Sequence, residues 1–153
     1  MKAKKGISPI LATVILIAVT LVVAVGVIGW VMGIWGSMGK TETLKIISGN
    51  ITLNMTENKA TLYLDVINQG TTDATIHKVV VAGQEFSGSN IKVYSPNGSP
   101  TNTQTIPADG KIYTVEVTDL NYNNYSAGVS YSVTVITKAG NQYPFVVQAV
   151  QQS

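Results

Sequence analysis

Few residues of this 153-residue chain could support metal or nucleophilic chemistry. The chain has no cysteine and one histidine, His77, so it offers no thiolate and no imidazole cluster for zinc or copper. The aspartates are scattered without the spacing of a calcium loop, and Asp109-Gly110 is typical of a turn. No glycine-rich loop precedes a helix, as phosphate binding would require. We therefore expect no catalytic, cofactor-binding or metal site, and no enzyme.

The chemistry that the sequence does offer is the modification of asparagine. Four Asn-x-Ser/Thr triplets could accept N-linked sugar, at Asn50, Asn54, Asn97 and Asn124. We expect at least one of them to carry sugar, which requires its side chain to face outward. Asn50 and Asn54 differ by four positions and can share one face of a strand.

The N-terminal part of the chain is a long uncharged segment. No charged residue lies between Lys5 and Lys40, and residues 10–35 are almost entirely apolar. Ser8 as N-cap and Pro9 at the first helical position predict a helix over residues 9 to about 38, roughly 45 Å long. A bilayer core is about 30 Å thick, so this helix can span it. The lysines before it, Lys2, Lys4 and Lys5, predict a cytoplasmic N-terminus and a C-terminal domain outside.

Four glycines recur three or four residues apart near the end of this segment: Gly26, Gly29, Gly33 and Gly36. At 3.6 residues per turn they share one helix face, and Gly29 and Gly33 have the GxxxG spacing of closely packed membrane helices. We expect helix–helix packing on this face; the alternative is the ordinary glycine content of a bilayer anchor. A conventional secretory signal is disfavoured, because its apolar region would be about 7–15 residues long and end in a small-x-small cleavage site.

Lys4-Lys5-Gly6 followed by Ile7-Ser8-Pro9 and the apolar helix resembles the N-terminus of archaeal type IV pilins, which carry a class III signal peptide. The resemblance implies cleavage between Gly6 and Ile7 by a prepilin peptidase that recognises the leader lysines, Lys4 and Lys5. Residues 1–6 would then be a leader, residues 7–39 a helix that spans the membrane before assembly and forms the filament core afterwards, and residues 40–153 an outer domain. The fifth mature residue is Leu11, where many archaeal flagellar-filament subunits have glutamate. This difference favours a pilin.

Beyond the helix, the hydrophobic pattern changes to the alternation of β-strands. Turn sequences such as Pro96-Asn97-Gly98 and Ala139-Gly140-Asn141 separate the apolar runs. The pattern predicts an α+β chain, in which one long N-terminal hydrophobic helix precedes an antiparallel immunoglobulin-like β-sandwich. The expected strands cover residues 45–55, 60–67, 75–81, 91–94, 112–118, 129–137 and 143–150. Five tyrosines, at 113, 122, 125, 131 and 143, suit aromatic packing better than an adhesive surface.

The sequence thus favours a structural subunit of an archaeal type IV pilus, used for adhesion and cell contact. Its expected partners are copies of itself in a helical homopolymer, the membrane before assembly, the prepilin peptidase and a pilus assembly platform. We expect it at the archaeal cell surface, with the cytoplasmic membrane holding the precursor. Nucleic acid is not expected, because the formal charge of +2 depends on the three leader lysines. The alternatives are a single-pass anchored surface protein with a β-sandwich binding domain and an archaeal flagellar filament subunit.

Overall fold

The computed structural model describes residues 2–152, with side chains described over residues 8–36 and 39–152. The chain divides into two compact units, one ending at Lys40 and the other beginning at Thr41.

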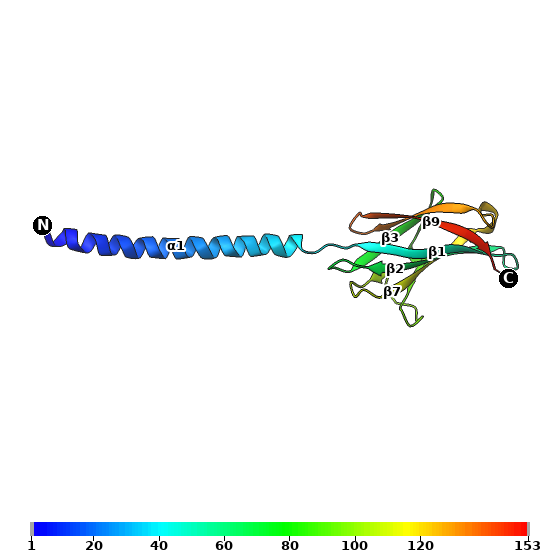
Figure 1. The fold of residues 1–153 in the computed structure, drawn as a ribbon, viewed down its shortest axis with the longest axis horizontal. Helices are drawn as coiled ribbons and strands as arrows, with labels where there is room; N and C mark the ends of the chain where they lie inside the picture. The colour runs from blue at the N-terminus through cyan, green and yellow to red at the C-terminus, as the bar shows by residue number, and fades with distance from the viewer. Residues whose placement is uncertain (1, 153) are drawn as a thin grey trace. The chain divides into compact units, whose positions relative to one another are not determined.

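The first unit is a single helix, α1 (Lys2–Met38), which carries the blue colours of Figure 1. The prediction that the helix begins at Ser8 and Pro9 was wrong, because α1 extends back to Lys2 with Pro9 inside it. Lysine and alanine are strong helix formers, so the residues before Ser8 continue the helix. Because proline has no N–H, Pro9 cannot donate to the carbonyl of Lys5, and α1 lacks one backbone hydrogen bond there.

The second unit consists of β-strands joined by short loops. Seven of the strands correspond to the seven predicted ones; the two short strands β4 and β6 were not predicted. β4 holds one buried residue, Phe86, and β6 has two residues, so neither is long enough to show a clear alternation. Short 3₁₀ helices, η1 (Gly88–Asn90) and η2 (Tyr122–Asn124), follow β4 and β7. The strands are β1 (Leu44–Asn54), β2 (Lys59–Asn68), β3 (Ala74–Val81), β4 (Gln84–Ser87), β5 (Ile91–Tyr94), β6 (Thr105–Ile106), β7 (Ile112–Asn121), β8 (Ser130–Thr137) and β9 (Gln142–Gln151).

The strands form one sheet in the order β4-β3-β8-β9-β1-β2-β7-β5, with β6 beside β3. Figure 1 shows that the sheet curls, so that β3 and β9 lie on one side and β2 and β7 on the other, with β1 between them. Its two end strands, β4 and β5, follow each other in the chain and are joined by η1. The result is a nearly closed β-sandwich, and the predicted α+β class is confirmed.

One strand pair departs from the predicted antiparallel arrangement. β1 and β9 run parallel, with Asn50 opposite Gln148 and Thr52 opposite Val150. The direction of β9 follows from its antiparallel pairing with β8. Alternation within a strand fixes which face it buries but carries no information on the direction of a distant partner, so the sequence could not reveal this pair.

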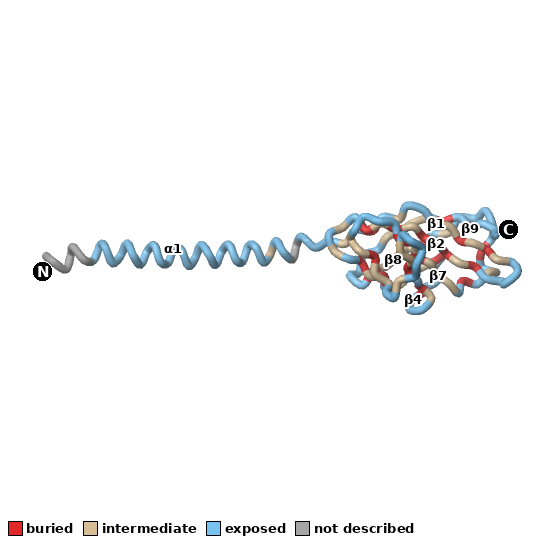
Figure 2. The backbone as a smooth tube through the Cα atoms, turned by 90° about the horizontal axis from the view of Figure 1, so that it is seen from below, coloured by how far each residue is buried: buried red, intermediate tan, exposed pale blue. Residues whose placement is uncertain are grey.

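The core of the second unit is apolar and follows the alternation of the strands. In β2, Leu62, Leu64 and Val66 are fully buried between residues that face outward. Figure 2 shows that the buried residues gather in the strands, whereas the described residues of α1 are exposed except for the half-buried Ile34. Among the described residues, Asn68 and Thr137 are the buried polar ones. The Asn68 amide group donates to the carbonyl of Ile106 at 3.0 Å, so its burial is compensated by hydrogen bonding.

The segment that leads into β1 is bonded into the sandwich. The Thr71 N–H donates to the carbonyl of Thr41 at 2.7 Å, and Asn141 Nδ2 donates to the Glu42 carboxylate at 2.8 Å. The Thr137 hydroxyl donates to the same carboxylate. Residues 41–43 therefore belong to the sandwich rather than to a free linker.

Candidate functional site

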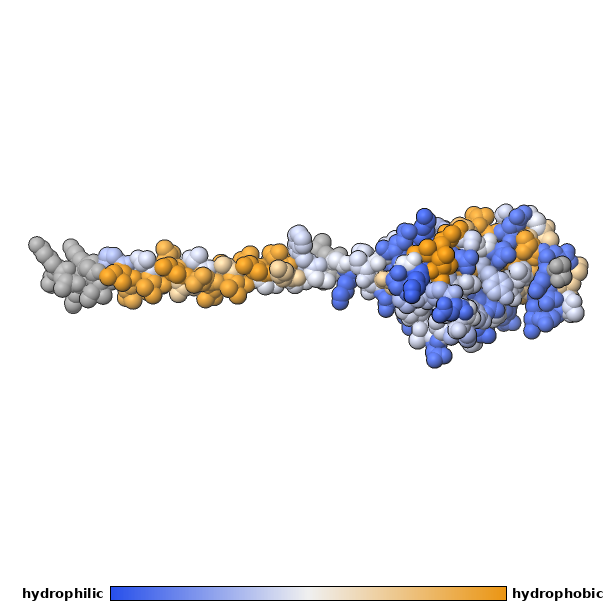
Figure 3. Space-filling view, turned by 60° about the horizontal axis from the view of Figure 1, so that its bottom comes forward, coloured by the Kyte–Doolittle hydropathy of each residue, from blue (hydrophilic) through white to orange (hydrophobic). Residues whose placement is uncertain are grey.

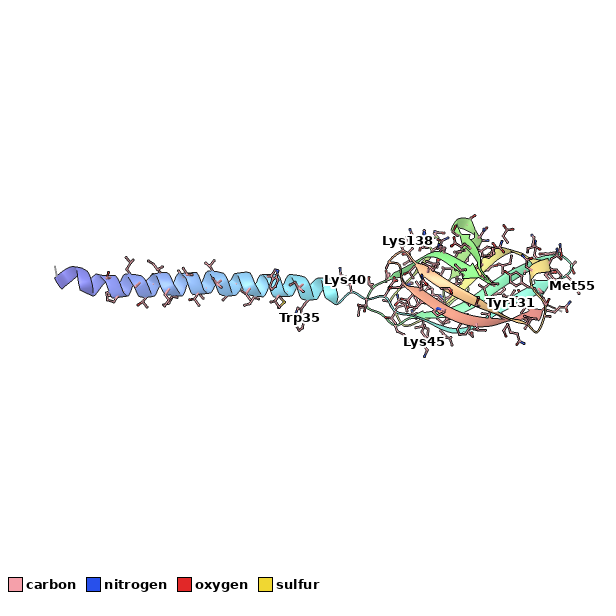
Figure 4. All side chains as sticks on the ribbon, turned by 90° about the horizontal axis from the view of Figure 1, so that it is seen from above. Trp35, Lys40, Lys45, Met55, Tyr131 and Lys138 are labelled. Atoms are coloured by element: carbon pink, nitrogen blue, oxygen red, sulfur yellow. The ribbon has the colours of Figure 1, made fainter. Side chains whose placement is uncertain are left out.

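The most unusual surface of the chain is that of α1. Its segment Ser8–Gly36 contains an 18-residue window with a mean hydropathy of 3.0 and is long and apolar enough to cross a membrane. Every residue of that segment is exposed except Ile34, which is half-buried. The apolar side chains project on all sides of the helix in Figure 4, and Figure 3 shows their hydrophobic surface along it. Such a surface requires a non-aqueous environment around its whole circumference.

The polar side chains within the apolar segment are satisfied inside the helix. Thr13 Oγ1 donates to the carbonyl of Pro9 at 2.7 Å, and Thr20 Oγ1 donates to the carbonyl of Leu16 at 2.7 Å. Threonines bonded to the preceding turn need no partner from outside the helix. These two bonds make the segment compatible with a bilayer or with an apolar bundle.

The four glycines form an open stripe on α1. Apart from the neighbouring residues and backbone of α1 itself, no described atom lies within 4 Å of the position that a Cβ would occupy at Gly26, Gly29, Gly33 or Gly36. Glycine in a helix interior costs up to about 1 kcal/mol relative to alanine, and no close packing among the described residues of α1 offsets that cost. The space beside the stripe could admit the backbone of another helix; the predicted packing role itself remains a prediction.

The predicted cleavage site consists of Lys4, Lys5, Gly6 and Ile7, for which the structure describes the backbone alone. The backbone there belongs to α1, and Pro9 follows it within one turn. If the chain were cut before Ile7, Pro9 would lie in the first turn, where backbone N–H groups have no helical partner. The missing hydrogen bond between Lys5 and Pro9 would then cost nothing.

Two of the four candidate glycosylation sites lie on β1. Asn50 and Asn54 are both half-buried, and the residues between them, Ile51 and Leu53, point into the core. As predicted, the two asparagines share the outer face of the strand. Asn54 Oδ1 accepts hydrogen bonds from the N–H groups of Thr56 at 3.0 Å and Glu57 at 3.2 Å. Asn54 therefore also stabilises the turn between β1 and β2.

The other two candidate sites are exposed. Asn97 lies in the turn after β5, and Asn124 is the last residue of η2. Neither position is covered by the sandwich, so both can accept a bulky group with the least rearrangement. Sugar attachment at any of the four sites stays a prediction.

The residues considered for metal or acid–base chemistry are dispersed. Over residues 2–152, no group of three or more His, Cys, Asp or Glu residues could hold a metal ion. His77 is exposed on β3. Hydrogen bonds from the Lys111 N–H and the Tyr113 hydroxyl lower the pKa of Asp109, which closes the predicted turn.

Sequence reasoning did not single out Tyr63 and Tyr94, which face outward on β2 and β5. The five tyrosines that it did consider pack as expected. Tyr113 and Tyr125 are buried, and the rings of Tyr125 and Tyr131 meet edge to face with centroids 5.0 Å apart. Alternation in β2 could have placed Tyr63 outward, because it lies between Leu62 and Leu64.

No protein-family model matches this chain, and no curated protein sequence does. Among solved structures, it is similar to the archaellum periplasmic stator protein FlaG from Sulfolobus acidocaldarius, with a TM-score of 0.46 and 15% identity over 69% of this chain and 99% of that chain. It is also similar to the structure of the Iho670 flagellar-like filament, with a TM-score of 0.44 and 16% identity over 92% of this chain and 98% of that chain. At TM-scores this low the similarities carry no argument about function.

Proposed function

We propose that this chain is the structural subunit of a cell-surface filament of the archaeal type IV pilus kind, polymerising through α1. The observation that carries the proposal is the uncovered apolar segment Ser8–Gly36, which has no buried residue in the isolated chain. The sandwich would form the outer layer of the filament, where it meets other cells or surfaces.

Exposing α1 to water would be very unfavourable. Burying one side chain of the size of Val, Leu or Ile contributes about 1.5–3 kcal/mol, and the segment presents such side chains along 29 residues. Two environments could cover the whole circumference of the helix: lipid, or helices with the same kind of surface. A filament subunit uses both in succession, first as a membrane protein and then in the core of the polymer.

The transfer between these environments is energetically feasible. Lipid tails are nearly as apolar as a bundle of such helices, so leaving the bilayer for the bundle involves little change in hydrophobic free energy. A contact that repeats from one copy to the next without closing produces a helical polymer. We infer that a prepilin peptidase first removes residues 1–6, and that an assembly platform then drives extraction.

The single-pass anchor is the second candidate, because the same segment has the length and composition of a membrane span. In that case α1 would stay in lipid and the sandwich would act alone as a binding module. A flagellar filament subunit would share the polymeric core, and Leu11 in place of a glutamate disfavours it.

Shearing cells that produce the chain would distinguish these possibilities. We expect the chain in detached fibres, with Ile7 as its first residue by N-terminal sequencing. An anchored protein would remain in the membrane fraction, and that result would refute the proposal. Intact leader residues in the fibres would refute the cleavage between Gly6 and Ile7 alone.

The glycine stripe offers a sharper test of assembly. Gly29→Leu should leave membrane insertion intact, because leucine is favourable in lipid, while reducing the yield of fibres by blocking close helix contact. Ala24→Leu is the matched control, since the helical period places Ala24 on the opposite face of α1. Equal fibre yields from the two variants would show that the stripe is not a packing face.

A further inference from the structure

The outer face of four neighbouring strands, β1, β2, β7 and β5, gathers aromatic and polar side chains that filament assembly through α1 does not use. Strand register places Asn50, Tyr63 and Glu116 in one row across the sheet, and Asp65, Thr114 and Tyr94 in the adjacent row. We call these six residues the tyrosine face.

The two tyrosines lie close to each other and to Glu116. A hydrogen bond with Glu116 raises the pKa of Tyr94. The negative charge of an ionised Tyr63 would raise the same pKa further. Burial raises the pKa of Tyr63, and the charge of Glu116 contributes to the same direction. Tyr63 keeps 37% of its surface exposed, unlike Tyr113 and Tyr125 in the core. Aromatic surface therefore remains available to a ligand.

The polar groups of the face are held in place but retain bonding capacity. Asp65 Oδ2 accepts from Ser48 Oγ at 2.9 Å, and Asp65 Oδ1 accepts from Thr114 Oγ1 at 3.0 Å. Each carboxylate oxygen can accept more than one hydrogen bond, so Asp65 can still receive donors from a ligand. The Asn50 amide adds both a donor and an acceptor beside Tyr63.

Shallow hollows lie at the two ends of the tyrosine face. One, of about 260 Å³, is lined by residues that include Asn50, Tyr63 and Asp65. The other, of about 550 Å³, is lined by residues that include Tyr94 and Thr114. The face is therefore extended and bounded by open hollows, which suits an elongated ligand better than a small compact one.

We propose that the tyrosine face binds a neutral oligosaccharide. The apolar C–H face of a sugar ring can lie on Tyr63 or Tyr94, while its hydroxyl groups donate to Asp65 and Glu116 and bond to Asn50. The proposal does not depend on filament assembly, because the site lies wholly within the sandwich and would serve an anchored protein equally well.

The charge and hydrogen bonding of this region argue against other ligands. The negative charges of Asp65 and Glu116 are balanced by Lys92, which lies beside Glu116, and by Lys111, which lines the larger hollow. The region therefore has no excess charge to attract an anionic or a cationic polymer. A peptide added as an extra strand would need a free edge on β5. Thr101 already donates to the carbonyl of Val93 from its N–H at 2.8 Å and from its hydroxyl at 2.9 Å.

The candidate glycosylation site at Asn50 has a direct consequence for this proposal. Sugar linked to Asn50 would stand beside Tyr63 and cover the face that a free oligosaccharide needs. The proposed ligand is an oligosaccharide that is not attached to this chain. Its binding requires Asn50 to be unmodified.

The test uses the full chain, produced in bacteria without N-linked glycosylation and kept in a detergent that has no sugar head group. Neutral glucose, mannose and N-acetylglucosamine oligomers are the probes, with oligogalacturonate as the acidic comparison, and affinity is measured by calorimetry. We expect a neutral oligomer to bind, and Tyr63→Ala or Tyr94→Ala to weaken it about tenfold through loss of the ring. Tyr63→Phe, which keeps the ring, should retain most of the affinity.

Tyr122→Ala is the matched control, since this half-buried tyrosine lies in η2, outside the face. Near-UV circular dichroism verifies that each variant is folded. No neutral binding, preference for the acidic oligomer, or equal losses in the Tyr63 and Tyr122 variants would each overturn the proposal. Chain purified from native cells that binds added sugar only after deglycosylation would also overturn it, by identifying the chain's own glycan as the occupant.

Discussion

The two units of this protein contain the same apolar residue types, but the sandwich buries them and the helix exposes them. In α1, Val22 leaves 73% of its surface exposed, whereas Val66 and Val115 in the sandwich are fully buried. The sandwich finds its apolar partners along its own chain. The described residues of α1 have no such partners within their own unit, and we infer that they take them from lipid or from other copies of the chain. Burial of apolar residues in the sandwich thus depends on the chain itself, whereas burial of α1 depends on what surrounds it.

The aromatic residues allow the two units to be followed separately in one sample. Both tryptophans, Trp30 and Trp35, lie on α1, and all seven tyrosines lie in the sandwich. Tryptophan fluorescence therefore reports the environment of the helix. Near-UV circular dichroism from tyrosine reports the packing of the sandwich.

The largest effect should come from placing a charge on α1. Val22→Asp introduces a carboxylate at the centre of the apolar segment, where membrane insertion costs about 2.5–3.5 kcal/mol per aspartate. The remaining apolar residues should keep the segment in the membrane, although its insertion is weakened, and the buried carboxylate should abolish fibre formation. Fractionation and the yield of sheared fibres measure the two effects.

The same substitution at Val146 provides the control. Val146 on β9 leaves 64% of its surface exposed, close to the value for Val22, but it belongs to the sandwich. Val146→Asp should change the free energy of unfolding by no more than about 0.5 kcal/mol and should leave assembly intact. If it prevented fibre formation as Val22→Asp does, the outer face of β9 would also be an assembly surface and the contrast between the units would fail.

The next effect concerns the core of the sandwich alone. Leu62→Ala removes a fully buried side chain and should lower the free energy of unfolding by about 2–5 kcal/mol, through lost burial and a residual cavity. Urea unfolding of the full chain in detergent, followed by the tyrosine signal, measures this loss. The tryptophan emission should be unchanged in the native baseline. A shift in that emission would show that the helix senses the core of the sandwich.

A smaller effect is expected where residues 41–43 join the sandwich. A Cβ at Gly70 would lie 2.2 Å from the carbonyl oxygen of Thr41 and 2.6 Å from the Thr43 nitrogen. Both are backbone atoms that no rotamer change can move, so Gly70→Ala should displace the segment at a cost of about 1–3 kcal/mol. Hydrogen exchange at the Gln69 and Thr71 amides, which bond to this segment, should accelerate.

Gly83→Ala is the control for Gly70→Ala, because it separates the effect of a steric collision from that of backbone strain. Gly83 has a φ of +86° and open space around its Cβ position, so alanine there meets strain but no atom. It should lower stability without accelerating exchange at Gln69 or Thr71. Faster exchange in both variants would mean that the amides report global instability rather than loss of the segment.

The sequence predicted the parts of the fold that depend on local periodicity. The uncharged run revealed α1, and alternation revealed seven strands, with β5 (Ile91–Tyr94) correct at both ends. The beginning of the helix was wrong because Ser8 and Pro9 have the residue types of an N-terminus, while the propensity of the lysines and Ala3 before them is not visible in the apolar pattern. The parallel pairing of β1 with β9 depends on where a distant strand docks, which no local pattern encodes.

The candidate sites divide in the same way. The four asparagine triplets and the glycine stripe are written in consecutive or helically spaced residues, so the sequence alone could find them. The tyrosine face combines residues from β1, β2, β5 and β7, several of which are far apart in the chain. Only the strand register brings Tyr63, Glu116 and Tyr94 together.

The smallest effect should come from the Asp109 turn, which lies on the surface of the sandwich. Hydrogen bonds from the Lys111 N–H, at 3.0 Å, and from the Tyr113 hydroxyl, at 2.8 Å, lower the pKa of Asp109 below its ordinary value of 3.8. A carboxyl whose pKa is lowered by folding stabilises the fold above its unfolded pKa, and this contribution disappears as the pH falls through the folded pKa. Wild type should therefore exceed Asp109→Asn in urea midpoint above pH 3.8, and the difference should shrink below it.

The hydrogen bond between the Tyr113 hydroxyl and Asp109 raises the pKa of Tyr113. The contribution of this bond to stability should therefore also be lost at alkaline pH. A group whose pKa is raised by folding stabilises the fold fully below its unfolded pKa, here 10.0, and the effect disappears as the pH rises through the folded pKa. Tyr113→Phe removes the donor. In that background, the pH-dependent effect of Asp109→Asn should shrink to the share due to the Lys111 N–H. An undiminished effect of Asp109→Asn would mean that the Lys111 N–H accounts for all of it. The Tyr113 hydroxyl on β7 would then contribute nothing to the stability of the turn.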